Sequence, residues 1–193
     1  VVRWDGANWI PMGSDFGGDV YDLIVFNGEL IAAGYLRYSG ATVLENVARW
    51  NGSAWAPFGT RPLGLVAAMI IHDGQLVLSG YDPYSVDPYN AVRWDGQAWQ
   101  PLGTSPSREM LALAVHDNVL YGSGGFDASA SGSSVFRWNG SSWIALPGTA
   151  HRVFSLQVFD NALVAAGSNA DGSDIPVSRW DGNTWSPIGS RFN

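Results

Sequence analysis

The chain has 193 residues and a formal net charge of −7; 46% of its residues are hydrophobic and 14% are charged. All of its basic residues are arginine, and such an acidic chain lacks the basic stripe that phosphate neutralisation needs, so we expect no nucleic-acid partner. The sequence has no cysteine for disulfides or metal ligation, and no run of about 18 apolar residues that would predict a membrane span.

The first expected element is a short hairpin over residues 1–13, built on the pattern R-W-[D/N]-G-x-x-W. The pattern occurs five times, at intervals of 46, 44, 44 and 42 residues, and such a period is typical of repeat architectures. The copies contain Arg3, Arg49, Arg93, Arg137 and Arg179, and all ten tryptophans of the chain: Trp4, Trp9, Trp50, Trp55, Trp94, Trp99, Trp138, Trp143, Trp180 and Trp185. In each copy we expect two strands joined by a type I′ turn such as Asp5-Gly6.

A second kind of hairpin follows each of the first four copies. Its first example runs from Val20 to Leu36 with a turn at Asn27-Gly28. Its counterparts turn at Asp73-Gly74, Asp117-Asn118 and Asp160-Asn161. The first strand of each hairpin is almost wholly apolar, which predicts that both of its faces are covered. The second strand ends in glycine (Gly34, Gly80, Gly124 and Gly167), which favours a bulge or a close approach of neighbouring backbone.

Four antiparallel strands in about 44 residues, with no helical periodicity, indicate the blades of a β-propeller. We therefore expect an all-β fold, a single array with about 4.5 blades of four strands. The incomplete blade is the hairpin 1–13, and the blades cover 20–59, 66–103, 110–148 and 153–189. The tryptophans are expected to pack between blades, since each buries roughly 150–250 Å².

The small residues that end the second strand, followed by two spaced tryptophans, resemble the kelch repeat. They are Ala33-Gly34, Ser79-Gly80, Gly124-Gly125 and Ala166-Gly167, of which one is a true diglycine. The pattern is more similar still to the R-W-[D/N]-G-x-x-W-x-P-L-G arrays of secreted and cell-surface bacterial proteins. This resemblance covers the whole chain, and it implies a propeller fold and a secreted or cell-surface location.

The chain has five tryptophan-bearing hairpins, which we call outer hairpins. It has only four hairpins of the second kind, which we call inner hairpins, so one blade is incomplete. Three interpretations follow. The chain is a segment of a longer propeller, or it closes as a four- or five-bladed ring, or its open edges pair with a neighbouring chain. We favour the first interpretation.

The best candidate binding residues lie in loops that do not repeat. Two Asp-Pro-Tyr copies place three phenol rings and two carboxylates in one loop, as Tyr81, Asp82, Tyr84, Asp87 and Tyr89. The corresponding loop one unit earlier contributes Tyr35, Arg37 and Tyr38. Rings with hydrogen-bonding groups at their edges suit a glycan or a protein partner.

Other candidates are better explained by structure. The motif arginines are expected to stack on indoles or to pair with turn carboxylates. His72 and His116 occupy the strand-end place of Phe26 and Phe159, so we expect them to be structural. Two groups of oxygen ligands are weak calcium candidates: Asn169, Asp171 and Asp174, and Asp15, Asp19 and Asp22.

No catalytic set emerges from the sequence, and no cofactor is expected. A copper-radical oxidase of the kelch type needs a cysteine, which this chain lacks. We therefore predict a non-enzymatic binding or structural scaffold module of a secreted or cell-surface protein. Three alternatives stay open: a lectin-like module that binds carbohydrate through the aromatic loops, a self-assembling subunit, and a glycosidase or lyase with carboxylates from different blades. The partner is accordingly a protein, a glycan, further copies of the chain or the rest of a longer chain.

Overall fold

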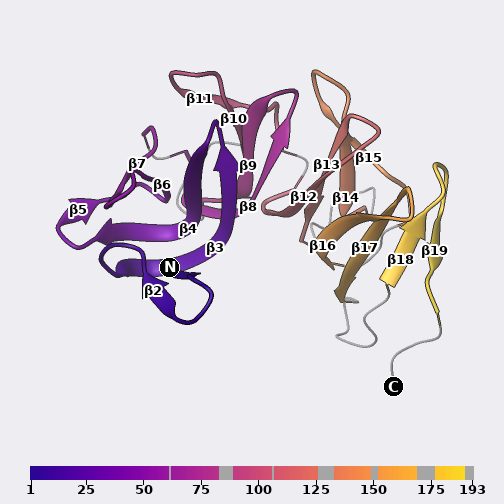
Figure 1. Ribbon diagram of the computed structural model, residues 1–193. Coiled ribbons are helices and arrows are strands. Elements are labelled where there is room, and N and C mark those ends of the chain that lie inside the picture. The colour runs from indigo at the N-terminus through magenta and orange to yellow at the C-terminus, as the bar shows by residue number, and fades with distance from the viewer. Residues whose placement is uncertain are drawn as a thin grey trace.

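The computed structural model describes residues 1–60, 62–82, 89–105, 107–125, 133–148, 152–168 and 177–189 (Figure 1). These residues form strands and turns without helix, which confirms the all-β prediction. Each of the four complete repeat units is one antiparallel sheet with four main strands paired in chain order, and the first sheet has a short fifth strand at its side. An additional two-stranded hairpin precedes them.

The strands have the following bounds. The N-terminal hairpin is β1 (Val2–Trp4) and β2 (Trp9–Pro11). The first sheet is β3 (Phe16–Phe26), β4 (Glu29–Ser39), β6 (Val47–Trp50) and β7 (Trp55–Pro57), with β5 (Thr42–Val43) paired to β4. The second is β8 (Leu65–His72), β9 (Gln75–Tyr81), β10 (Ala91–Trp94) and β11 (Trp99–Pro101). The third is β12 (Met110–His116), β13 (Val119–Gly124), β14 (Val135–Trp138) and β15 (Trp143–Ala145). The fourth is β16 (Arg152–Phe159), β17 (Ala162–Ser168), β18 (Val177–Trp180) and β19 (Trp185–Pro187).

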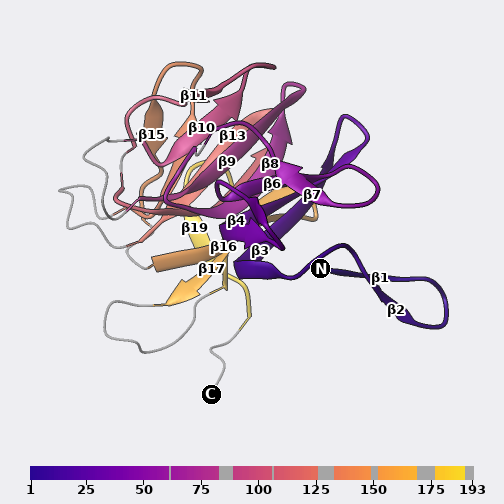
Figure 2. The ribbon, with the colours of Figure 1, turned by 90° about the vertical axis from the view of Figure 1, so that its left-hand side faces the viewer.

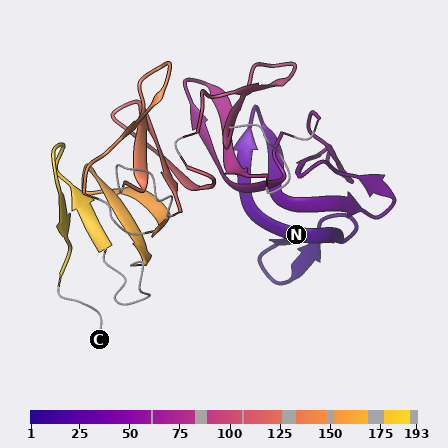
Figure 3. The same ribbon diagram turned by 180° about the vertical axis from the view of Figure 1, so that it is seen from behind.

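Successive sheets contact each other through their first strands, β3 with β8, β8 with β12, and β12 with β16. Figures 1 and 3 show the sheets following one another across the molecule in chain order. The hairpin β1–β2 lies at one end of this series and the fourth sheet at the other, and they remain apart in the turned view of Figure 2.

The inner hairpins, and not the tryptophan-bearing ones, have the type I′ geometry. Asn27 and Gly28 both have positive φ, 50° and 80°, and are the only two residues between the paired Phe26 and Glu29. The same two-residue turn recurs in the other three sheets. An Asn-Gly or Asp-Asn pair reaches these angles at low cost, which fixes the register of each hairpin.

The type I′ prediction was wrong for the motif hairpins. Trp4 pairs with Trp9, so the loop contains four residues, of which only Gly6 has a positive φ, 107°. The Asp5 carboxylate accepts the amides of Ala7 and Asn8 at 2.8 and 2.7 Å. Asn51, Asp95, Asn139 and Asp181 accept the equivalent amides. The motif needs an aspartate or asparagine because its side-chain oxygen replaces the backbone acceptor of a tight turn.

The bulges predicted from the strand-end glycines are confirmed. In all four sheets the register shifts by one residue opposite the glycine, as between Val66 and Ala68 opposite Gly80. A Cβ on Gly80 would overlap the carbonyl oxygen of Leu65, and the glycines of the first and fourth sheets are equally close to backbone oxygens. Glycine is therefore required for this approach of two strands.

The core consists of apolar layers between neighbouring sheets. Phe26 and Ile31 of the first sheet pack with Met69 and Leu78 of the second, and equivalent layers lie at the other two junctions. Each layer includes tryptophans of the later sheet. Each junction between sheets therefore depends on residues of both the inner hairpin and the tryptophan-bearing hairpin of the repeat.

The tryptophans join each sheet to the linker of the unit before it. The indole Nε1 of Trp55 donates to the carbonyl of Met12 at 2.8 Å, and that of Trp143 donates to Leu102 at 2.8 Å. Trp99 makes the equivalent bond to Phe58 at 3.3 Å. The two indoles of each pair lie 5.1 to 5.4 Å apart. We call this arrangement, a linker carbonyl and glycine seated on a tryptophan pair, the tryptophan clasp.

The last clasp is irregular. The linker that precedes the fourth sheet, Leu146-Pro147-Gly148, is one residue longer than the linker Leu102-Gly103 that precedes the third. The carbonyl of Leu146 accepts a hydrogen bond from the Ser133 hydroxyl at 2.6 Å. The buried Nε1 of Trp185 has no acceptor among the described residues. The linker is also farther from this indole, since a Cβ on Gly148 would lie 3.9 Å from Trp185 Cδ1.

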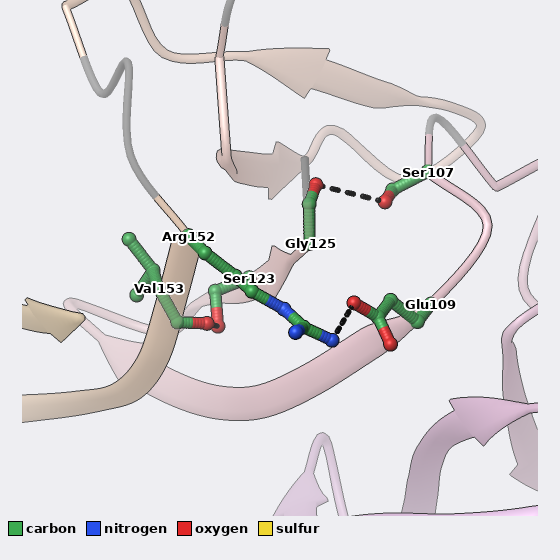
Figure 4. A network of polar contacts seen from close by, with 6 residues as sticks. All are labelled: Ser107, Glu109, Ser123, Gly125, Arg152 and Val153. Carbon is green, nitrogen blue, oxygen red and sulfur yellow. Dashed lines mark hydrogen bonds and ion pairs between the residues drawn. The ribbon is translucent and has the colours of Figure 1, made fainter. Parts of the chain in front are cut away.

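Polar contacts also connect the third and fourth sheets (Figure 4). Arg152 at the start of β16 donates to the carboxylate of Glu109, and the Ser123 hydroxyl donates to the carbonyl of Val153 at 3.1 Å. Ser107 donates to the carbonyl of Gly125 at 3.4 Å. This network gives Glu109 and Arg152 a structural role at the junction.

The expectation that every first strand is covered on both faces was wrong for the two end sheets. Leu23 of β3 is 45% exposed, whereas its equivalents Met69, Leu113 and Leu156 are 7%, 8% and 2% exposed. Phe159 of β16 is 71% exposed, whereas Phe26 is 7% exposed. Each end sheet has a neighbour on one side only, so its other face carries the same apolar pattern without a cover.

Candidate functional site

A pocket of about 630 Å³ lies between the first and second sheets. Its described lining residues are Tyr21, Tyr35, Leu36, Arg37, Leu44, Glu45, Asn46, Gly64, Leu65 and Tyr81. Three of the sequence-predicted binding residues are therefore in one place: Tyr35 and Arg37 from the first unit and Tyr81 from the second. Two further residues that line the pocket, Tyr21 and Glu45, were not predicted from the sequence.

The long strand β4 positions Tyr35 and Arg37. It continues well past its glycine, whereas the other second strands end at or one residue after theirs, and β5 pairs with its last residues. Tyr35 and Arg37 are two residues apart, so they project on the same side of the strand. The Arg37 guanidinium lies 4.8 Å from the centre of the Tyr35 ring and donates a hydrogen bond to its hydroxyl.

This contact fixes the position of the positive charge in the pocket. The hydrogen bond to Tyr35, together with the nearby phenol groups, raises the pKa of the Arg37 guanidinium above its usual value. Arginine is a cation in proteins in any case, so the effect of the contact is to direct the remaining N–H groups of Arg37. Tyr35 is 37% exposed, so one part of its ring remains accessible.

A β-bulge positions Tyr21. The register of β3 and β4 passes from Val20 to Asp22 and leaves Tyr21 unpaired between them, opposite Gly34. Tyr21 is 54% exposed and lines the pocket together with Tyr81 of the second sheet. The glycine that predicted the bulge was the available signal for this residue, because a bulged position redirects its side chain.

Asn46 holds the base of the pocket. It has a positive φ of 69°, is 5% exposed, and donates to the carbonyls of Leu63 and Gly64 at 2.9 and 2.8 Å. Asn90 makes the corresponding bond to Ser107 at 2.6 Å in the next unit. Asn46 is therefore part of the repeat, and it links the loop that carries Glu45 to the second sheet.

The other sequence-predicted site residues do not join this group. Tyr38 lies with its ring against Gly17, Asp82 lies beside Gly64, and Tyr89 is 36% exposed; none of the three is among the described residues lining the pocket. Tyr84 and Asp87 lie outside the described residues. Each of the two predicted aromatic loops thus contributes only its first residues to the shared pocket.

Metal binding receives no support in the described part of the chain, which has no group of three or more His, Asp or Glu that could hold an ion. Asp22, one of the weak calcium candidates, instead accepts the Met69 amide at 2.7 Å and the Leu23 amide at 2.8 Å. Asn169, Asp171 and Asp174 lie outside the described residues.

The histidines and arginines of the repeat make contacts between and within units. His72 Nε2 lies 3.1 Å from the carbonyl of Asn118, and His116 Nε2 lies 3.2 Å from that of Asn161, in each case the turn of the next sheet. Arg179 donates to the carbonyl of Asp160 at 3.1 Å. A second, polar pocket of about 440 Å³ between the second and third sheets includes His72 and the motif residues Arg93 and Arg137.

Comparison of the sequence with protein-family models and with curated proteins finds no match. No helix among the described residues is long and apolar enough to cross a membrane. The function must therefore be argued from the pocket itself. Its chemistry combines three phenols, a guanidinium and a carboxylate around an open space.

Proposed function

We propose that this chain is a non-enzymatic binding module of a secreted or cell-surface protein, and that the pocket between its first and second sheets binds a carbohydrate. One observation carries the proposal: three tyrosines, an arginine and a glutamate from two neighbouring sheets line the same open pocket of about 630 Å³. Pockets of about 300–1,000 Å³ are typical of small-ligand sites.

The residue types suit a sugar. A saccharide presents C–H groups on the faces of its ring and hydroxyls at its edge. A phenol ring packs against the C–H groups of the sugar. The N–H donors of Arg37 and the carboxylate acceptors of Glu45 match the hydroxyls. Because Arg37 is already bound to Tyr35, it loses little conformational freedom when a ligand binds.

The lining favours binding over hydrolysis. Glycosidases use two carboxyl groups about 5–9.5 Å apart on either side of the scissile bond. Among the described residues that line this pocket, Glu45 is the only carboxylate. This supports the non-enzymatic function over the glycosidase alternative.

The same proposal includes the fold in its finer form, a kelch-like β-propeller in which the four sheets are blades. Support comes from the strand order, which is the same in every sheet, and from the contacts of each first strand with the first strand of the next sheet. The pocket then lies between two blades, where loops from both can be varied without affecting the repeat.

A glycan array followed by titration calorimetry with the best ligand tests the function. We expect binding, and we expect Tyr35→Ala and Arg37→Ala each to raise the Kd at least about tenfold, which corresponds to about 1.4 kcal/mol. Phe154→Ala is the matched control, since Phe154 is 50% exposed with the Arg152 guanidinium 5.2 Å from its ring centre, yet does not line the pocket. Binding to no glycan, or an unchanged Kd in the Tyr35→Ala variant, would contradict the proposal.

A further inference from the structure

Arg93 lies on the face of the second sheet that is turned toward the third sheet. Its neighbour Trp94 packs in the other direction, with its ring 4.8 Å from that of Phe58 in the preceding linker. Successive side chains of a strand point to opposite faces, so Arg93 lies on the face away from this linker. Arg93 also pairs in register with Val77, which packs in the layer between the second and third sheets. The arginine therefore faces the polar pocket of about 440 Å³ that it lines at this junction.

Arg93 differs from two of its equivalents in having no acidic partner. The Arg49 guanidinium lies 3.7 Å from the Glu29 carboxylate, and the Arg179 guanidinium lies 3.9 Å from that of Asp160. In the second unit the place of Glu29 is taken by Gln75, which is neutral. Among the residues that the structure describes, no carboxylate lies within ion-pair distance of Arg93. Its side chain is exposed at the pocket as an uncompensated cation.

The aspartate of the adjacent turn does not neutralise Arg93. Asp73, the equivalent of Asp160, accepts a hydrogen bond from the side-chain amide of Asn118 in the third sheet at 3.0 Å. Its carboxylate also lies 3.7 Å from His72 Nε2, and this nitrogen donates to the carbonyl of Asn118 at 3.1 Å. These contacts hold the acid of the turn against the third sheet and leave the Arg93 guanidinium available.

A neutral donor lies on the same face as Arg93. Gln75 and Val77 are two residues apart in β9, so the Gln75 side chain projects on the side of Arg93. Gln75 is half-buried and lines the pocket. Arg137 lines it too, but pairs in register with Tyr121, which packs in the layer between the third and fourth sheets. The side chain of Arg137 therefore lies on the other face of its sheet, and Arg93 is the cation directed into this pocket.

We propose that this second pocket binds a small ligand through an anionic oxygen group, a carboxylate, sulfate or phosphate, with Arg93 as the principal contact. A guanidinium presents its N–H groups in a planar fork that matches two oxygens of such a group. The Gln75 amide adds a neutral donor beside it. The ligand then supplies the negative charge that Glu29 supplies to Arg49 in the first unit. The volume lies in the range of about 300–1,000 Å³ that is typical of small-ligand sites.

This anion site is separate from the pocket proposed for carbohydrate. The carbohydrate pocket contains Tyr35 and Tyr81, late in the second strands of their hairpins, whereas the anion site contains Gln75, at the start of such a strand. The described residues that line the two pockets are different throughout. One molecule can therefore hold both ligands, and the anion site does not depend on the proposed carbohydrate function.

Nuclear magnetic resonance of the ¹⁵N-labelled full chain tests the anion site. Sodium sulfate is added from about 0.1 to 20 mM at constant ionic strength, a range that brackets a Kd on the order of 1 mM. We expect saturable shifts of the backbone amides of Gln75, Arg93 and Gly140. Phosphate and glucuronate, titrated in the same way, show which anionic group is preferred. Glucose, the neutral counterpart of glucuronate, should leave these three amides unchanged.

Gln75→Glu is the most informative variant, because it places a carboxylate where Glu29 pairs with Arg49 and keeps Arg93 itself. We expect Gln75→Glu and Arg93→Gln each to raise the Kd for sulfate at least about tenfold. Arg49→Gln removes a motif arginine that already has an acidic partner, so it is the matched control and should leave the Kd unchanged. Shifts that stay linear in sulfate concentration, an unchanged Kd in Gln75→Glu or Arg93→Gln, or an equal response to glucose would overturn the proposal. The Arg93→Gln variant should keep its affinity for a glycan bound in the first pocket, so the two proposals fail separately.

Discussion

Replacing Trp143 with alanine removes an indole of the third sheet that is both buried in the core and hydrogen-bonded to the preceding linker. The side chain is 8% exposed and packs in the layer between the second and third sheets. A buried tryptophan removes about 150–250 Å² from water, and about 25 cal/mol per Å² gives an upper limit of roughly 4–6 kcal/mol. The substitution also leaves the carbonyl of Leu102, itself on a 3% exposed residue, without the indole donor.

We expect Trp143→Ala to lower the free energy of unfolding by about 3–5 kcal/mol, in the range of other large core truncations. Trp143→Phe keeps most of the apolar area and loses the N–H donor, so it should cost about 1–3 kcal/mol. Trp9→Ala, at the same position of the repeat, should cost under about 1 kcal/mol because Trp9 is 65% exposed.

Urea unfolding followed by far-ultraviolet circular dichroism measures these differences without relying on tryptophan fluorescence. If Trp143→Ala and Trp9→Ala have equal effects, the clasp does not stabilise the junction and the reasoning fails.

Two further predictions concern the turns and the bulges. Backbone amides lower the pKa of Asp5, Asp95 and Asp181, first through the amides of Asn8, Ala98 and Thr184. The stabilisation from these turns is therefore present above the unfolded-state pKa and is lost as the pH falls through the lower folded-state pKa. Changing all three residues to asparagine should keep the turns, as in Asn51, and make the urea midpoint less dependent on pH between 5 and 2; an unchanged dependence would count against this cause. For the bulge, Gly80→Ala should cost about 1–3 kcal/mol through overlap with Leu65, whereas Gly74→Asn, which adds its side chain in open space, should be nearly neutral in the same denaturation assay. Equal midpoints for these two variants would contradict the steric argument.

Much of the fold could be predicted because its signals are local. Two-residue turns such as Asn27-Gly28 and strand-end glycines such as Gly80 specify backbone angles that few other residues accept, and both predictions agree with the structure. The motif turn was misassigned because Asp-Gly also fits a type I′ turn. The Asp5 side chain decides between a type I′ turn and a longer loop, because it accepts hydrogen bonds from two amides and stabilises the longer loop.

The site was harder to predict because it depends on contacts between units. Tyr35, Arg37 and Tyr81 were identified from their composition and place in the loops. Nothing in the sequence indicates that they line one pocket, since this depends on how the second sheet packs on the first. Tyr21 belongs to an apolar strand and reaches the pocket only through the bulge at Gly34. Contacts of this kind have no signature in a local pattern.

The most direct test of the proposed function is a crystal structure of the protein with its best-bound glycan. We predict a sugar ring stacked on a phenol ring of the pocket between the first and second sheets, with at least one hydroxyl within hydrogen-bonding distance of the Arg37 guanidinium. Glycan density at another surface, with this pocket empty, would contradict the account.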